Sequence, residues 1–60
     1  MNLAWITKET RQRMGVSQAK FAELVGSNQT EISFIERGFI PNDQDKMDKI
    51  YELYYKTLKG

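Results

Sequence analysis

Apolar residues recur every three or four positions along most of the chain, which is the spacing of one face of an α-helix. Glycine follows residues 14, 25 and 37, at points where a helix would need a left-handed C-terminal residue. No run alternates apolar and polar residues between turn signals, as a half-buried β-strand would. We therefore predict an all-α fold with helices over residues 2–14, 17–25, 28–37 and 43–59.

Capping residues indicate where these helices begin. Ser17 and Asn28 are good N-cap residues, because their side-chain oxygens accept hydrogen bonds from the unpaired amides of a first turn. Glu31 follows Asn28 by three positions, which predicts a pattern like a capping box at the third helix. The fourth helix is expected to begin at residue 42 or 43. The acidic residues at its start do not predict a calcium site, because the glycine and the terminal glutamate of a calcium loop are missing.

Each expected helix has one apolar face, and together these faces predict the core. Aromatic residues at helical spacing more often form a core or a dimer seam than a base-stacking surface. Tyr51 and Tyr54 are therefore expected inside, and Tyr55 at solvent or at a partner. The expected core comprises Leu3, Ile6, Thr10, Met14, Phe21, Leu24, Val25, Ile32, Ile35, Met47, Ile50, Tyr51, Tyr54 and Leu58.

The interval between the second and third helices is short. Phe21-Ala22, Gly26 and Ile32 predict a tight turn, with a small residue where the helices cross and a glycine where the backbone turns left-handed. Two helices at about 90–120° joined by a turn of three or four residues form a helix-turn-helix. This arrangement presents the N-terminus of the third helix as a protruding end.

Composition excludes several function classes. The chain has no cysteine and no histidine, so disulfides, cysteine-rich zinc sites and the usual neutral-pH acid–base group are missing. No catalytic constellation is recognisable, and 60 residues leave little volume for a substrate cleft. We expect no enzyme activity, metal, cofactor or small-molecule substrate. No apolar run approaches the ~20 residues of a membrane span, which favours a soluble cytoplasmic domain.

A specific set of residues runs without a gap through the second and third helices. It comprises Ser17-Gln18, Phe21-Ala22, Gly26, Ile32-Ser33, Glu36, Gly38 and Pro41. In these residues the chain resembles the phage Cro and CI repressor-like helix-turn-helix domains, also called the Xre family, over residues 1–41. The resemblance implies that residues 1–60 form one compact, all-α, lambda-repressor-like bundle of four helices, or five if the family's usual fifth helix is present. Here one long, tyrosine-rich helix stands where the family places its dimer contact.

The family's functional residues carry over position by position, with the third helix entering the major groove by its N-terminus. The resemblance implies DNA base contacts by Gln29, Thr30, Ser33 and Phe34. It implies phosphate contacts by Gln18, Asn28 and Arg37. It also implies a buried ion pair between Arg11 and Glu36, which ties the first helix to the third.

The function expected from these features is sequence-specific binding of double-stranded DNA by a transcriptional regulator. The resemblance implies a repressor that binds a palindromic operator as a homodimer. Nine basic and eight acidic residues give a net charge of only +1, whereas a strong nucleic-acid binder usually has a larger basic excess. The alternative is an antirepressor-like or antitoxin-like protein-interaction module on the same fold, which binds a protein partner such as another repressor or a toxin through Phe34 and Phe39.

Phe34 is the least explained residue of the set. At 100° per residue it points away from the side of the third helix that carries Ile32 and Ile35. It can be an isolated exposed apolar residue, or it can pack under the segment Phe39-Ile40. It can also contact thymine methyl groups or bind a protein partner. The sequence leaves these four interpretations open.

Overall fold

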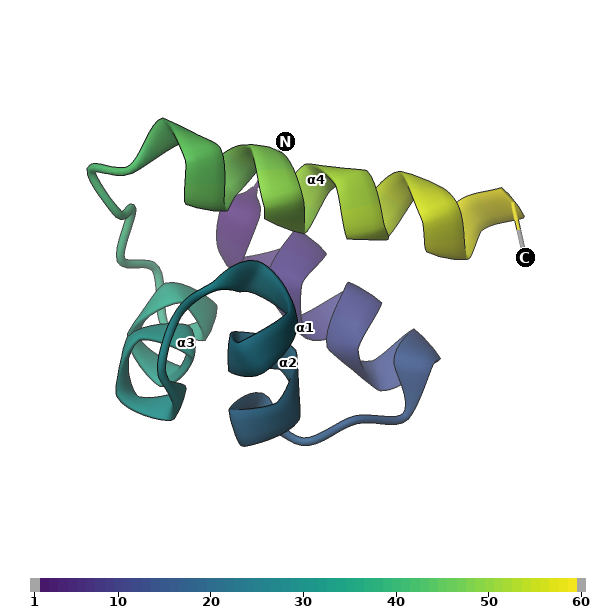
Figure 1. The fold of residues 1–60 in the computed structure, drawn as a ribbon, viewed down its shortest axis with the longest axis horizontal. Coiled ribbons are helices and arrows are strands. Elements are labelled where there is room, and N and C mark those ends of the chain that lie inside the picture. The colour runs from purple at the N-terminus through teal and green to yellow at the C-terminus, as the bar shows by residue number, and fades with distance from the viewer. Residues whose placement is uncertain (1, 60) are drawn as a thin grey trace.

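The computed structural model describes residues 2–59, which form four helices and no strand. They are α1 (Leu3–Met14), α2 (Gln18–Val25), α3 (Gln29–Glu36) and α4 (Gln44–Lys59) (Figure 1). The all-α prediction is confirmed, and the predicted bounds differ only by the capping residues at the helix ends. Met1 and Gly60, the ends of the predicted domain, lie outside the described residues.

Side-chain caps and two glycines explain where the helices start and stop. A side-chain oxygen accepts a backbone N–H three residues later at the start of each helix, which satisfies one otherwise unpaired donor. The four capping residues are Asn2, Ser17, Asn28 and Asp43. Gly15 and Gly26 end α1 and α2 with φ of 70° and 74°, in the left-handed region that side chains disfavour.

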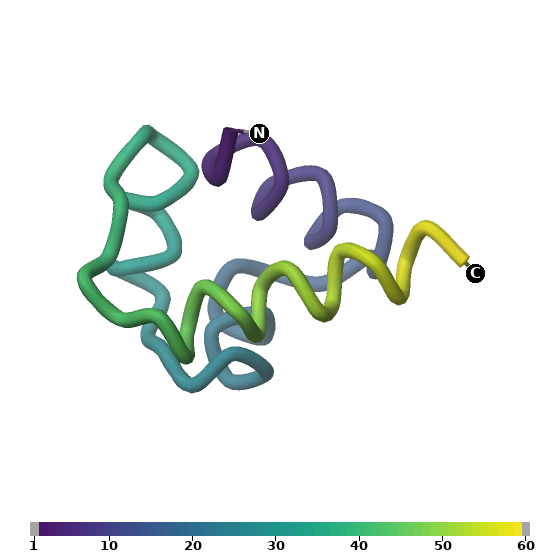
Figure 2. Tube along the Cα trace, turned by 90° about the horizontal axis from the view of Figure 1, so that it is seen from above, coloured from purple at the N-terminus to yellow at the C-terminus, as the bar shows by residue number. Residues whose placement is uncertain are grey.

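The helices enclose one apolar core. α1 packs against α3 and α4, and α2 packs against α3. α4 spans the length of the molecule, and α3 lies at one end (Figures 1 and 2). The sequence predicted most of the buried side chains, because each helix presents its apolar face inward. The core contains Leu3, Ile6, Phe21, Ala22, Val25, Ile32, Ile35, Ile50 and Tyr54.

The last turn of α4 departs from the prediction. Leu58 was expected in the core, but half of it is exposed. The C-terminal turn of α4 extends past the other helices in both views, so no helix remains for Leu58 to pack against (Figures 1 and 2). Leu53, which the predicted stripe omitted, instead packs against the core. Tyr55 is exposed as expected, and Tyr54 packs edge-on against Trp5 with ring centroids 6.3 Å apart.

Two hydroxyl groups on α1 are buried without a partner. Thr7 and Thr10 are fully buried, and neither hydroxyl has a hydrogen-bond partner within residues 2–59. We expect Thr7→Val and Thr10→Val each to raise the free energy of unfolding by about 1 kcal/mol, because valine keeps the shape and removes the unpaired polar atom. Urea unfolding followed by circular dichroism measures the change.

Thr57 provides the matched control for these substitutions. Its hydroxyl donates a hydrogen bond to the carbonyl oxygen of Tyr54 at 2.7 Å, so Thr57→Val should bring no gain in stability. A loss of stability in both the Thr7 and Thr10 variants would contradict the prediction and show that these hydroxyls are paired in solution.

Within residues 2–59, no helix is both long enough and apolar enough to cross a membrane.

Candidate nucleic-acid interface

A short turn sets the angle between α2 and α3. Gly26, Ser27 and Asn28 separate the two helices, and the Ser27 amide donates a hydrogen bond to the Ala22 carbonyl at 2.8 Å. The positive φ of Gly26 lets the chain reverse immediately after α2. Asn28 then caps α3 by accepting a hydrogen bond from the Glu31 amide at 2.8 Å. The first turn of α3 is thereby exposed at the surface beside the start of α2.

One hollow lies between the start of α2 and the outer side of α3. Six of the seven residues that the sequence assigned to DNA contact line it, although they come from two helices and are separated by up to 19 positions in the chain. These six residues are Gln18, Gln29, Thr30, Ser33, Phe34 and Arg37. We call them the α3 groove. The seventh, Asn28, is exposed at the N-terminus of α3, where its side-chain oxygen serves as the cap.

The α3 groove presents mainly neutral polar groups. Gln29 and Thr30 are exposed on the first turn of α3, and Ser33 is half-buried one turn later. Amide and hydroxyl groups of this kind can donate to and accept from base edges in a major groove. Arg37 is the one charged residue of the six.

Glu36 lies behind the groove and joins three helices. Its carboxylate accepts hydrogen bonds from Arg11 Nε at 2.7 Å and Arg11 Nη2 at 3.2 Å, and from Gln18 Nε2 at 3.3 Å. Arg11 Nη1 also donates to the Val16 carbonyl at 3.2 Å, which fixes the link between α1 and α2. The hydrogen bond to Glu36 raises the pKa of Arg11, while burial opposes this rise. The structure thus places Arg11 and Glu36 in a bidentate ion pair, with the Glu36 side chain only 7% exposed.

Gln18 belongs both to this network and to the α3 groove. Its side-chain amide donates to Glu36, and its second amide hydrogen and its carbonyl oxygen remain available to a ligand. Because Gln18 is the first residue of α2, its backbone N–H also lies at a helix N-terminus, which favours an anion. The sequence predicted the position of Gln18 at the groove, but not its hydrogen bond to Glu36.

The capping box predicted at α3 is only half formed. Asn28 caps the helix as expected, but the Glu31 carboxylate accepts hydrogen bonds from the Ser27 hydroxyl and the Lys46 ammonium group. Lys46 lies on α4, so this ion pair fastens the start of α3 to the start of α4. The Lys46 side chain is paired and only 15% exposed, so its ammonium group is poorly placed to contact a phosphate.

The ion pair between Glu31 and Lys46 makes a pH-dependent contribution to stability. Hydrogen bonding to Lys46, and then to Ser27, holds the pKa of Glu31 below the ordinary value of 4.5. Because the pKa is lower in the folded state, the stabilisation is complete above the unfolded-state pKa and is lost as the pH falls through the folded-state pKa. We expect Glu31→Gln to cost about 1 kcal/mol of unfolding free energy at pH 7 and much less at about pH 2.

Urea unfolding at the two pH values tests this expectation. Glu23→Gln is the control, because Glu23 is exposed and lies 4.0 Å from Lys20, at the limit of an ion pair. It should leave stability unchanged at both pH values. A cost of Glu31→Gln that stayed the same at low pH would contradict the assigned pairing.

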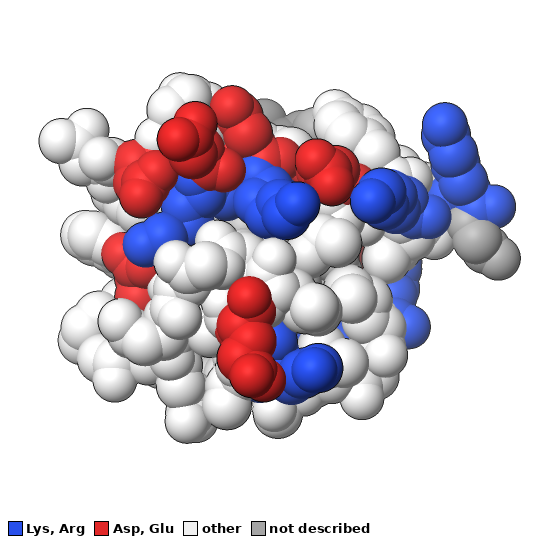
Figure 3. Space-filling model, in the orientation of Figure 1, with Lys and Arg blue, Asp and Glu red and all other residues white. Residues whose placement is uncertain are grey.

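Acidic partners also lie beside three further basic side chains, two of which share a single carboxylate. Lys49 and Lys56 both pair with Glu52, at 3.6 Å and 3.4 Å, and Arg13 pairs with Glu9 at 3.0 Å. In Figure 3 most of the charged side chains lie along α4, and a smaller group of acidic and basic side chains lies over α2. The positive potential that usually accompanies DNA binding is therefore weak on this face.

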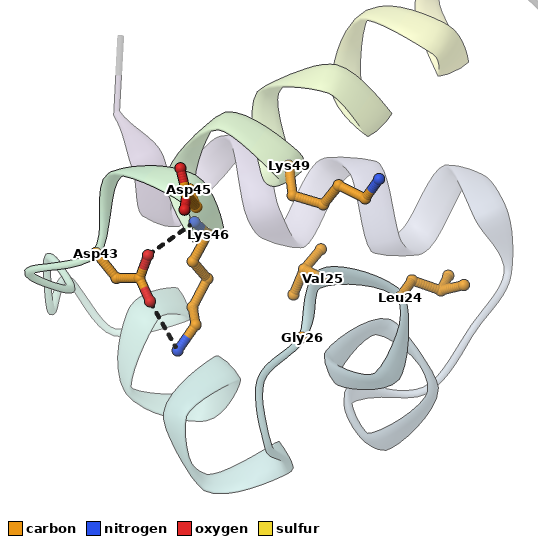
Figure 4. A pocket seen from close by; sticks show the side chains of 7 residues that line it. All are labelled: Leu24, Val25, Gly26, Asp43, Asp45, Lys46 and Lys49. Carbon is orange, nitrogen blue, oxygen red and sulfur yellow. Dashed lines mark hydrogen bonds and ion pairs between the residues drawn. The ribbon is translucent and has the colours of Figure 1, made fainter.

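A second hollow lies between the end of α2 and the start of α4 (Figure 4). Leu24, Val25 and Gly26 form one side of it, and two acidic and two basic residues at the opening of α4 form the other: Asp43, Asp45, Lys46 and Lys49. Asp43 caps α4 there: one of its carboxylate oxygens accepts a hydrogen bond from the Lys46 backbone amide, and the other lies 4.0 Å from the Lys46 side-chain nitrogen. The mixed charges make this hollow a poorer match for phosphate than the α3 groove.

The arrangement of α2 and α3 is that of a helix-turn-helix protein. A family model described as helix-turn-helix matches residues 8–50, which include α2, α3 and the opening of α4. The chain therefore belongs to the helix-turn-helix family of the Cro/CI repressor type, as the sequence predicted. No curated protein and no solved structure matches the chain significantly. The family comprises non-enzymatic, DNA-binding domains of the transcription-regulator type.

Proposed function

We propose that residues 1–60 form one domain that reads the sequence of double-stranded DNA with α3 and acts in the cytoplasm as a repressor. One observation carries the proposal: six residues from two helices line a single groove beside the protruding start of α3. All six present side chains that can hydrogen-bond or pack against DNA. The repressor role follows the family type, since a domain that occupies an operator blocks access to it.

The proposed contacts divide into base readout and positioning. Gln29 can pair with the N6 and N7 atoms of adenine, the Thr30 methyl can pack on a thymine methyl, and Ser33 can reach the next base. Gln18, Asn28 and Arg37 would hold phosphates, which sets the register but carries no sequence information. Arg11 and Glu36 would act only through the fold.

A domain with so few free cations needs a second copy to bind tightly. A two-fold dimer on a palindromic site, with half-sites about one helical turn apart, would double the number of contacts. Trp5, Tyr55 and Leu58 are half-exposed on the α1 and α4 side of the molecule, outside the α3 groove. Because α4 is acidic in its first turn and basic in its last, antiparallel packing of two such helices would bring opposite charges together.

Selection from random duplex DNA at two salt concentrations tests the proposed function. We expect a palindrome, with affinity falling as salt rises by a logarithmic slope of roughly −0.9 for each phosphate neutralised. Sedimentation of the complex with the selected site should give two chains per duplex. Folded protein that enriches no sequence at low salt would refute the DNA-binding proposal.

The competing function is capture of a protein partner. Its support is a run of exposed apolar side chains at the end of α3, where Phe34, Phe39 and Ile40 are 47%, 49% and 61% exposed. Such a partner should bind with little dependence on salt, since apolar contacts do not release counterions. The dependence of the binding constant on salt concentration, measured on the purified protein, therefore separates the two proposals: it is steep for DNA and shallow for a protein partner.

A further inference from the structure

The exposed ring of Phe34 has an intramolecular partner in Arg37, the residue directly after α3. The guanidinium carbon of Arg37 lies 5.0 Å from the centre of the Phe34 ring, within the range of a cation–π contact. Arg37 also donates from Nε to the Ser33 carbonyl at 3.3 Å, and from Nη2 to the Ser33 hydroxyl at 3.2 Å. We call this arrangement of Ser33, Phe34 and Arg37 the arginine clasp.

The clasp holds a flexible side chain in one place. Arginine normally loses considerable rotamer freedom when it is immobilised in a complex. Here the guanidinium carbon lies over an aromatic ring, and two of the three guanidinium nitrogens are already bonded to Ser33. Nη1 has no acceptor within residues 2–59, and it remains available at the rim of the α3 groove.

The clasp also accounts for the position of Phe34. The ring is 47% exposed and is not covered by the core, so its packing contributes little to the fold. An aromatic face at this position instead supports the one cation among the groove residues. A leucine or a serine at this position would offer no π face to a guanidinium.

We propose that Phe34 is a positioning residue, which pre-orients Arg37 so that its free Nη1 edge binds a DNA phosphate. This inference rests on the proposed function and extends it, because it makes the contribution of Phe34 to affinity depend on Arg37. Direct packing of Phe34 on thymine methyl groups would show no such dependence.

A double-mutant cycle on the selected duplex tests the dependence. Phe34→Leu keeps an apolar side chain but removes the aromatic face, and we expect it to weaken binding by about three- to ten-fold in the wild-type background. In the Arg37→Ala background the same change should cost less than about two-fold. Phe34→Tyr, which keeps the ring, should bind like the wild type. Arg37→Ala should reduce the magnitude of the salt slope by about one per chain.

Equal losses from Phe34→Leu in the two backgrounds would overturn the inference while leaving DNA binding itself established. A shift in base preference that persists without Arg37 would assign Phe34 to base readout instead. If the wild type binds no duplex, both the proposed function and the phosphate contact fail. Circular dichroism confirms that each variant is folded.

Nuclear magnetic resonance of the free wild-type protein provides a test that needs neither DNA nor a variant. The position of the Arg37 guanidinium over the Phe34 ring predicts nuclear Overhauser effects between the ring and the side-chain protons of Arg37, together with upfield ring-current shifts of those protons. Arg13, whose guanidinium carbon lies 5.9 Å from the ring centre of Tyr54, provides an internal comparison. Random-coil shifts for Arg37 would overturn the inference, because no preformed clasp would exist.

Discussion

Glu36→Ala is expected to lower the free energy of unfolding by about 3 kcal/mol, the largest effect of any substitution considered for this protein. Breaking a buried ion pair by removing one partner costs about 3–5 kcal/mol, because the remaining charge is left uncompensated. Arg11 retains 19% exposure and can be partly hydrated, which places the expected cost at the lower end. Gln18 would lose its acceptor at the same time.

Such a loss is large for a chain of this length. Total stability scales as about 0.05–0.15 kcal/mol per residue, or ~3–9 kcal/mol for 60 residues. The midpoint of thermal unfolding should fall by roughly 12–24 °C, as measured by circular dichroism. Glu9→Ala is the matched control, because Glu9 forms a more exposed pair with Arg13 within α1 and should cost no more than about 0.5 kcal/mol.

The alternative role of Glu36 predicts a different outcome. If Glu36 contacted DNA or oriented a base-reading group only, the alanine variant would melt like the wild type and lose affinity. We expect the reverse, with binding retained at temperatures where the variant is still folded. A wild-type melting curve combined with lost binding would show that the ion pair between Arg11 and Glu36 is not structural.

Gln29→Ala should have the largest effect on DNA binding, weakening it by about 5- to 150-fold on the selected site. This range corresponds to the ~1–3 kcal/mol that a bidentate pair with adenine contributes to discrimination. The variant should also lose its preference at one base pair of each half-site. Its melting temperature should not change, because Gln29 is exposed on the first turn of α3.

Titration of the variant with the selected duplex, and with a duplex in which guanine replaces the contacted adenine, measures both effects. Gln12→Ala is the control, because Gln12 is an exposed glutamine on α1 and does not line the α3 groove. It should bind both duplexes like the wild type. Equal discrimination by wild type and Gln29→Ala would contradict the proposed base contact.

Local signals allowed the sequence to predict the helices and the turn between α2 and α3. Ser17 and Asn28 cap helices, and Gly26 adopts the positive φ that ends α2. Each of these signals depends only on residues close by in the sequence. Once α2 and α3 are placed at the turn, helical spacing determines which side chains face outward. This explains why residues assigned to DNA contact from the resemblance share one hollow.

The contacts that the sequence did not predict are of two kinds. The ion pair between Glu31 and Lys46 joins residues 15 positions apart, and it depends on how the segment between α3 and α4 folds back, which no local pattern encodes. The contact of Arg37 with the Phe34 ring could have been predicted, because residues three apart at the end of a helix are neighbours. Leu58 was misplaced because periodicity does not reveal where a helix extends beyond its neighbours.

The pairing of three α4 lysines, Lys46 with Glu31 and Lys49 and Lys56 with Glu52, bears on how a regulator of this kind would search a genome. Non-specific affinity for DNA comes almost entirely from phosphate neutralisation, and here few cations remain for it. Such a protein would spend little time sliding on random sequence and would gain little from electrostatic steering. Its selectivity would then come from weak binding to non-specific DNA as much as from tight binding to its operator. A modest number of base contacts would therefore suffice to concentrate the protein at the operator.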